Sequence, residues 1–138
     1  MADISAHIEK KVALVDGGQS VLDAAKVMAQ KFIGSVVVTA SSDVKGIFTE
    51  RDLMRVVAQQ QDPAKVLLKD VMRAGLVKVG PHETVDHCLQ LMKENQCRHL
   101  LVFDNGNLIG IVSLRDMAAI MLEEKEHLIG QLTKYITG

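Results

Sequence analysis

Apolar residues recur along this chain with two spacings, one typical of strands and one typical of helices. Short runs rich in β-branched residues, such as Ser35–Thr39, predict buried strands. Apolar residues three and four positions apart predict amphipathic helices, the first starting at Ser20. In chain order we expect strand 12–15, a helix from Ser20, strands 35–39 and 44–48, helix 49–60, a short helix 67–72, strand 76–79, a helix from Thr84, strands 100–103 and 108–112, and a helix from Ser113.

The whole pattern occurs twice, at a constant offset of 64 residues. Gly46-Ile47-Phe48-Thr49-Glu50-Arg51-Asp52 returns as Gly110-Ile111-Val112-Ser113-Leu114-Arg115-Asp116, and no gap is needed from Val12 to Val57. The chain is therefore a tandem duplication, and each copy reads strand, helix, strand, strand, helix. One copy of about 60 residues would have too small a hydrophobic core to be stable alone. We expect an α/β (α+β) fold in which two β-α-β-β-α repeats pack about a pseudo-two-fold axis.

The expected domain organisation follows from the repeat and from Pro63, which is expected to stop the preceding helix. Residues 1–61 hold an N-terminal segment and the first copy. Residues 62–122 hold the linker and the second copy. Residues 123–138 are charged and helix-prone and predict a C-terminal helix.

Composition narrows the function classes. The 138 residues carry a net charge of −1, which gives no basic field for nucleic acid. Aromatic residues make up only 3% of the chain, so the core must be aliphatic. The N-terminus has no apolar signal region and no run is long enough to cross a bilayer, so we expect a cytoplasmic protein without a membrane span. Two cysteines, Cys88 and Cys97, favour reduced thiols.

The repeated stretch places a hydroxyl residue and an aspartate at the start of a helix. Thr49-x-x-Asp52 and Ser113-x-x-Asp116 each follow a glycine and an apolar strand. This spacing is a capping box, in which both side chains satisfy backbone N–H groups that have no partner inside the helix. Helix capping alone would account for the motif, and a binding role is the alternative.

This order and size of repeat resembles a pair of cystathionine β-synthase (CBS) domains, the Bateman module. The likeness covers essentially the whole chain and is close in His99–Asp104 and Asn107–Ser113, with Ile33–Val38 as the counterpart in the first copy. The resemblance implies a regulatory sensor that binds an adenosine-containing small molecule in clefts between the repeats and signals to a partner protein. AMP, ADP or ATP is the leading ligand, and NAD(H) and S-adenosylmethionine remain open.

The resemblance also implies roles for individual residues. Asp52 and Asp116 would accept hydrogen bonds from the ribose hydroxyls, while Thr49 and Ser113 would contact phosphate or ribose. A carboxylate suits a vicinal diol because it offers two acceptor oxygens to two donors. The remaining candidates are Arg51 and Arg115 as added charge, and Ile33 and Lys78 as lining of the adenine site.

The two copies differ where the second carries Arg98-His99 and the first carries Gly34-Ser35. In the regulatory subunit of AMP-activated kinase, which this region resembles, a basic pair at this place reaches phosphate. We expect one tighter site, dependent on Asp116 or Asp52 according to which cleft Arg98 faces. A solvated strand edge is the alternative reading of the pair.

Other chemistry finds little support in the sequence. His87 and Cys88 are adjacent on a predicted helix and face different ways, so we expect no metal site. No nucleophile and base stand in a catalytic order, so we expect no enzyme activity. Apolar helix faces at Leu53–Val57 and Met117–Met121 predict a homodimer. A ligand-free module that dimerises and docks a partner is the rival function.

Overall fold

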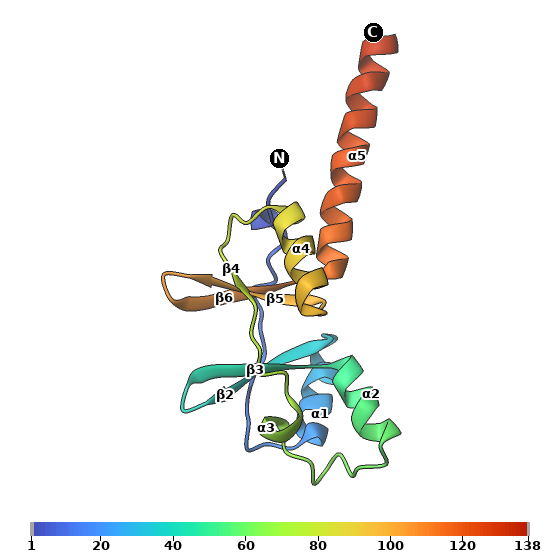
Figure 1. Cartoon of the computed structure of the whole chain (residues 1–138). Coiled ribbons are helices and arrows are strands. Elements are labelled where there is room, and N and C mark those ends of the chain that lie inside the picture. The colour runs from blue at the N-terminus through green and yellow to red at the C-terminus, as the bar shows by residue number, and fades with distance from the viewer. Residues whose placement is uncertain (1, 138) are drawn as a thin grey trace. The chain divides into compact units, whose positions relative to one another are not determined.

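The structure is a computed structural model that describes residues 2–137. The chain forms two compact units. Unit 2 is Lys11–Leu76, and unit 1 combines the residues up to Lys10 with those from Val77 onward. Figure 1 shows both units.

Unit 2 is a three-stranded sheet covered on one face by helices. Strand β1 is parallel to β2, with Val15 opposite Val38, and β2 is antiparallel to β3, with Val37 opposite Ile47. Helices α1 and α2 cover one face of the sheet (Figure 1). The elements are β1 (Leu14–Asp16), α1 (Val21–Lys31), β2 (Ser35–Ala40), β3 (Asp43–Thr49), α2 (Glu50–Ala58) and α3 (Leu68–Val71).

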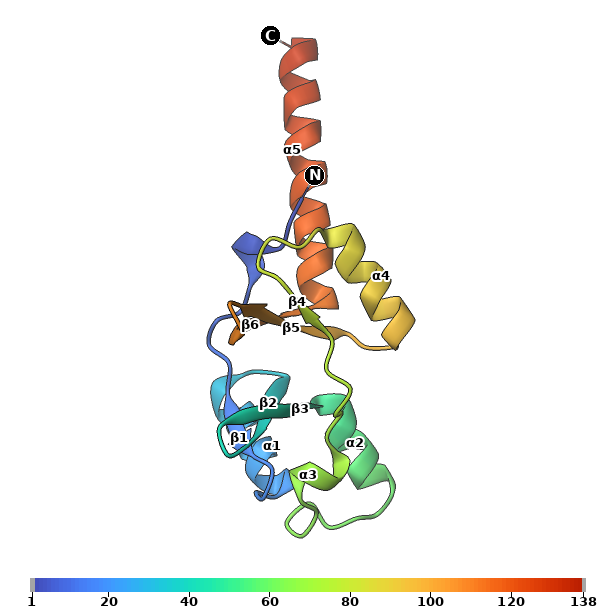
Figure 2. The same cartoon turned by 60° about the vertical axis from the view of Figure 1, so that its left-hand side comes forward.

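Unit 1 repeats this topology. Strand β4 is parallel to β5, with Val79 opposite Val102, and β5 is antiparallel to β6, with Leu101 opposite Ile111. Helix α4 and the first turns of α5 cover one face of the sheet (Figures 1 and 2). The elements are η1 (Ser5–His7), β4 (Lys78–Val79), α4 (Val85–Asn95), β5 (His99–Asp104), β6 (Asn107–Ser113) and α5 (Leu114–Thr137). The predicted α+β class with two repeats is confirmed.

The hairpin turns show how the two copies reach one backbone shape with different residues. Asn105 and Gly106 both have positive φ, 51° and 79°, the conformation that two-residue hairpins favour. Ser41 and Ser42 adopt the same conformation in the first copy, at 52° and 69°. The Asn-Gly pair is the sequence signal for this turn, whereas two serines are not.

Each unit has an aliphatic core of its own. In unit 2, Val36, Val38 and Phe48 from the sheet pack against Val21, Ala24, Met28 and Val56 from the helices. In unit 1, Leu100, Val102 and Val112 pack against Val85, Cys88, Met92 and Met117. No polar side chain among the described residues is buried, so burial of apolar area stabilises both cores.

The segment that precedes each copy along the sequence packs on the other copy. Residues 2–10 join the second copy, where the Glu9 and Ile111 backbones exchange two hydrogen bonds of 3.0 and 3.1 Å. Residues 62–76 join the first copy, where the Arg73 and Ile47 backbones do the same at 2.9 and 3.0 Å. The contact units therefore differ from the expected ranges 1–61 and 62–122, because these segments bond the free edges of β3 and β6.

This exchange explains the glycines of the repeated stretch. A Cβ on Gly46 would lie 2.8 Å from the Arg73 carbonyl oxygen and 2.6 Å from the Met72 sulfur. A Cβ on Gly110 would lie 2.7 Å from the Glu9 carbonyl oxygen and would also meet the Ile8 side chain. Only glycine lets the exchanged segment approach the strand this closely.

The C-terminal region also differs from its expected division. Leu114–Thr137 is one continuous helix of 24 residues, so the last repeat helix and the expected helix 123–138 are a single element. Residue 138 lies outside the described residues. The boundary at 123 marks only the point where α5 stops packing on unit 1, since Ile120 is its last buried side chain.

We predict that Gly46→Ala destabilises the protein by about 1–3 kcal/mol, because the added methyl group meets a backbone carbonyl that cannot move alone. Denaturant unfolding of the two proteins measures the change. Gly75→Ala is the matched control, since a Cβ at Gly75 meets nothing within 4 Å. Equal effects of the two substitutions would show that the close approach does not constrain the fold.

We further predict that Cys88 reacts with a thiol reagent far more slowly than Cys97 in the native protein. Burial, with a smaller contribution from the charge of Glu83, raises the pKa of the Cys88 thiol to about 11, so roughly a thousandth of it is thiolate at pH 8. Cys97 is only partly buried. Alkylation followed by mass spectrometry checks the order. Modification of both cysteines at one rate, or of Cys88 first, would contradict the buried placement.

Candidate functional site

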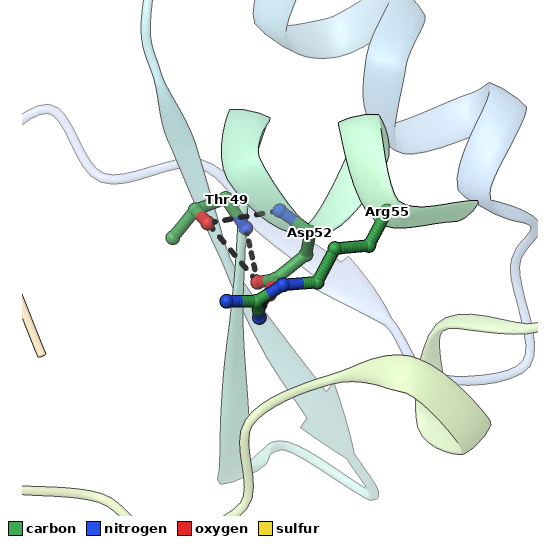
Figure 3. Close-up of polar contacts among 3 residues, drawn as sticks. All are labelled: Thr49, Asp52 and Arg55. Carbon is green, nitrogen blue, oxygen red and sulfur yellow. Dashed lines mark hydrogen bonds and ion pairs between the residues drawn. The ribbon is translucent and has the colours of Figure 1, made fainter. Parts of the chain in front are cut away.

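The first candidate turn joins β3 to α2 through a capping box. The Asp52 Oδ2 atom accepts hydrogen bonds from the Thr49 backbone N–H at 2.9 Å and from the Thr49 hydroxyl at 3.1 Å. The Thr49 Oγ1 atom in turn accepts the Asp52 N–H at 3.4 Å. Figure 3 shows the carboxylate turned back onto Thr49. The predicted helix start is confirmed, and one carboxylate oxygen is fully engaged in it.

The second oxygen of Asp52 forms an ion pair. The Arg55 Nη1 atom lies 3.3 Å from Asp52 Oδ1, one turn further along α2 (Figure 3). The Asp52 side chain is 16% exposed and that of Arg55 is 62% exposed. A surface pair of this kind contributes less than about 1 kcal/mol to stability, so it is easily broken. The Arg55 guanidinium nevertheless engages Asp52 Oδ1, the acceptor oxygen that a ribose diol would need.

The second candidate turn repeats this geometry between β6 and α5. The Asp116 Oδ2 atom accepts hydrogen bonds from the Ser113 N–H at 2.7 Å and from the Ser113 hydroxyl at 3.0 Å. Residue 119, which matches Arg55 in the repeat, is alanine. Oδ1 of Asp116 therefore lacks the ion pair that Oδ1 of Asp52 makes, and the two carboxylates differ in this respect.

The structure places Arg98 and His99 in the same unit as the second turn. His99 pairs with Ser113 across the β5–β6 ladder, and the Leu114 N–H donates to the Arg98 carbonyl oxygen at 2.8 Å. Arg98 is exposed and His99 is partly buried. The backbone of the basic pair therefore lies beside the Asp116 turn, and the cleft that the Arg98 side chain faces stays a prediction.

The matching place in unit 2 has a different charge. Ser35 pairs with Thr49, and the Glu50 N–H donates to the Gly34 carbonyl oxygen at 3.0 Å. The Glu50 side chain lies over Gly34, where an added Cβ would meet its carboxylate. The first turn thus joins Glu50 and Asp52 with Arg51 and Arg55, whereas the second joins Asp116 with Arg98, Arg115 and His99. The second turn is the more positive of the two.

The structure does not bring all of the other predicted site residues to the two capping turns. Arg51 and Arg115 are exposed in the first turns of α2 and α5. Ile33 is partly buried against the core of unit 2. Lys78 is exposed on β4, and its ammonium group lies 4.6 Å from the centre of the Phe103 ring, toward the hairpin end of the sheet. The structure does not bring Lys78 to the Ser113 end.

Sequence reasoning missed Arg55 and Glu50. Both had a readable signal, because Arg55 stands three residues after Asp52 on one helix, a spacing that brings charged side chains together. Glu50 has leucine as its counterpart in the second copy, which marks a change of charge at an equivalent position.

Neither a metal-ligand cluster nor a membrane span is found among the described residues. Within residues 2–137, no three His, Cys, Asp or Glu side chains are grouped to hold a metal ion. Over the same range, no helix is both long and apolar enough to cross a membrane.

Comparison with known proteins places this geometry in a family. The model for the CBS domain matches residues 2–59 and again residues 68–123. The CBS domain-containing protein YhcV of Bacillus subtilis is 34% identical over 119 residues, which are 86% of this chain and 84% of that protein.

Solved structures agree with the sequence matches. The CBS-domain containing protein ATU1752 from Agrobacterium tumefaciens is 34% identical with a TM-score of 0.75, over 81% of this chain and 85% of that one. A hexameric CBS-CP12 protein from bloom-forming cyanobacteria is 26% identical with a TM-score of 0.78, over 86% of this chain and 70% of that one. The chain therefore belongs to the CBS-domain family and consists of a tandem pair of these domains.

Proposed function

We propose that this CBS pair is a regulatory module that binds an adenine nucleotide (AMP, ADP or ATP) at the Ser113–Asp116 turn and signals the bound state to a partner protein. The observation that carries the proposal is the Asp116 carboxylate, which lies in a strand-to-helix turn with Arg98 beside it. One oxygen of the carboxylate fixes the turn, and the other is left without the ion pair seen at Asp52.

The chemistry of the turn fits an adenosine phosphate in two parts. A ribose diol donates two hydrogen bonds, and an ionised carboxylate is the stronger kind of acceptor for them. The α5 N-terminus and the guanidinium groups of Arg98 and Arg115 favour the negative charge of phosphate. Adenine would contact aliphatic side chains, and Lys78 is left out of this proposal because its ammonium group lies over Phe103, away from Ser113.

The first turn is proposed as the weaker site. Arg55 engages the second oxygen of Asp52, and Glu50 adds a negative charge where the second copy has Leu114. Both features oppose an anionic ligand with a diol. Thr49, Arg51 and Asp52 keep the same backbone geometry, so this turn remains a second, lower-affinity candidate.

The module is proposed to act as a cytoplasmic homodimer without catalytic activity of its own. On α2, the side chains of Met54 and Val57 are 63% and 58% exposed, although both are apolar. An apolar helix face of this kind suits a contact between two copies. The same observation favours the rival function, a ligand-free module for dimerisation and docking.

Binding is tested first by calorimetry and thermal melting with AMP, ATP, NADH and S-adenosylmethionine. A ligand that binds only the folded state stabilises it by about 2.7 kcal/mol at a hundredfold excess over its dissociation constant. We expect Asp116→Asn to weaken AMP binding by about tenfold to a hundredfold, because the amide keeps the cap but loses the charge of the acceptor.

Asp86→Asn is the matched control. Asp86 is exposed in the first turn of α4, and its substitution removes the same charge from unit 1. It should leave AMP affinity within about twofold of wild type. Arg98→Ala should weaken AMP but spare adenosine, which has no phosphate. If no adenosine compound raises the melting temperature, the ligand-free docking module becomes the better reading.

A second prediction concerns the ion pair at the first turn. In an Asp116→Asn background, we expect Arg55→Ala to strengthen adenosine binding at Asp52, because the substitution releases the second carboxylate oxygen. Adenosine is the right probe, since it carries no phosphate whose attraction to Arg55 would be lost. The free energy of unfolding should change by less than about 0.5 kcal/mol.

Arg51→Ala serves as the control for this experiment, because it removes one positive charge from the same helix turn without touching the ion pair. Calorimetry of both variants decides between them. Unchanged or weaker adenosine binding in the Arg55→Ala variant would mean that the ion pair does not compete with the ligand.

A further inference from the structure

Helix α5 carries an apolar stripe that the fold of unit 1 does not use. The helix extends past the N-terminal end of α4 (Figure 2), and every side chain from Met121 to Ile136 is exposed. Six of these side chains are large and apolar, and they are at least half exposed. They are Met121, Leu122, Leu128, Ile129, Leu132 and Ile136, with Tyr135 beside them at 91% exposed.

The spacing of the stripe is a heptad repeat. Leu114, Met121, Leu128 and Tyr135 are seven residues apart, and so are Leu122, Ile129 and Ile136. Lys125 and Leu132 form the third line of the same face. Two apolar lines and a third that carries both Leu132 and Lys125, each repeating every seven residues, produce a seam along which a second helix packs knobs into holes.

The seam lies on the side of α5 that faces away from unit 1. Met117 and Ile120 are buried in the core of unit 1. The Glu123 carboxylate lies 3.0 Å from the His7 Nε2 atom of the N-terminal segment. At about 100° per residue, these three positions centre more than about 120° around the helix from the seam. The body of the unit therefore leaves the seam open.

The seam is complementary to itself when reversed. Lys125 and Tyr135 stand at equal distances from residue 130, and so do Leu128 and Leu132. An antiparallel copy thus places its Tyr135 ring against Lys125, where a cation–π contact can form, and its Leu132 against Leu128. A parallel copy would instead set Lys125 against Lys125. The only cation of the seam therefore selects the antiparallel arrangement.

The area fits a contact of modest size. In this register five apolar or aromatic side chains of each copy lie opposite the partner helix: Leu128, Ile129, Leu132, Tyr135 and Ile136. If each loses about 100 Å² on pairing, each copy buries roughly 500 Å², at the lower end of specific interfaces. We propose that residues 124–136 pair antiparallel with the same segment of a second copy of this chain. This contact is additional to any dimer through the repeat helices and does not depend on nucleotide binding.

The full-length protein tests the proposal through cysteine cross-linking under mild oxidation. In the antiparallel pair, a Lys125→Cys, Tyr135→Cys double variant forms a disulfide-linked dimer, because each new cysteine faces the other one in the partner. Neither single variant should cross-link beyond the wild-type level. Cross-linking of a single variant would overturn the antiparallel arrangement, and no cross-linking of the double variant would overturn the pairing.

Sedimentation over a concentration series gives an independent measurement. Leu128→Glu combined with Leu132→Glu should weaken this association by roughly a hundredfold or more, since each places a charge in the seam. The control combines His127→Glu with Gly130→Glu, which adds the same charge on the opposite side of the helix, where a Cβ at Gly130 meets nothing within 4 Å. Equal effects of the two pairs, or a wild-type chain that does not self-associate, would reject a second copy as the occupant.

Discussion

The close approach of one backbone segment to a glycine is the constraint on which each unit depends. At Gly46 and Gly110 the exchanged segment comes so near that a methyl group would meet its carbonyl oxygen. The adjoining residues, Ile47 and Ile111, exchange two backbone hydrogen bonds with that segment. The strand is thereby held on both edges, because its other edge pairs with β2 or β5. A strand bonded on both sides cannot shift its register cheaply, and its end is fixed in position.

The turn at the end of that strand uses the same atoms for stability and, under the proposed function, for recognition. The hydroxyl of Thr49 or Ser113 and one carboxylate oxygen of the aspartate satisfy backbone donors at the helix start. Such a cap contributes about 1 kcal/mol on its own. The second oxygen is then held in a known direction at almost no further entropic cost. A rigid acceptor binds a diol more tightly than a mobile one, because less side-chain freedom is lost on binding.

The duplication, the order of elements and both capping turns were predictable, because the signals for them lie within a few residues or repeat at one offset. The repeated motif that contains Gly46 and Gly110 was visible in the sequence. The close approach of a second backbone segment, which requires glycine at both positions, was not visible. Ile4 is buried in the core of unit 1 and Leu68 in the core of unit 2. These contacts join segments far apart in the sequence, and no local pattern indicates which copy they pack on. The continuous α5 was divided wrongly because the charge of Glu123–Glu126 resembles a boundary, although charged residues favour an exposed helix. At the candidate site, strand pairing places the Arg98 backbone beside Leu114. The Lys78 side chain lies over Phe103 and does not reach the Ser113 end of the sheet, which its position in the sequence did not indicate.

The two copies keep one backbone scaffold although most of their side chains differ, and some of these differences lie at the turn where a ligand would be held. Pairing registers, hairpin turns and capping bonds match residue for residue across the offset, whereas Gly34, Glu50 and Arg55 have Arg98, Leu114 and Ala119 as counterparts. Arg98 in place of Gly34 and Leu114 in place of Glu50 make the second turn more positive, whereas Ala119 in place of Arg55 removes both a positive charge and the ion pair to the aspartate. Electrostatic attraction at a partly buried turn is screened less than at an open surface, so the charge changes at Arg98 and Leu114 act on the same anion. Under the proposed function, the fold keeps two equivalent turns for stability while the second turn serves as the stronger anion site.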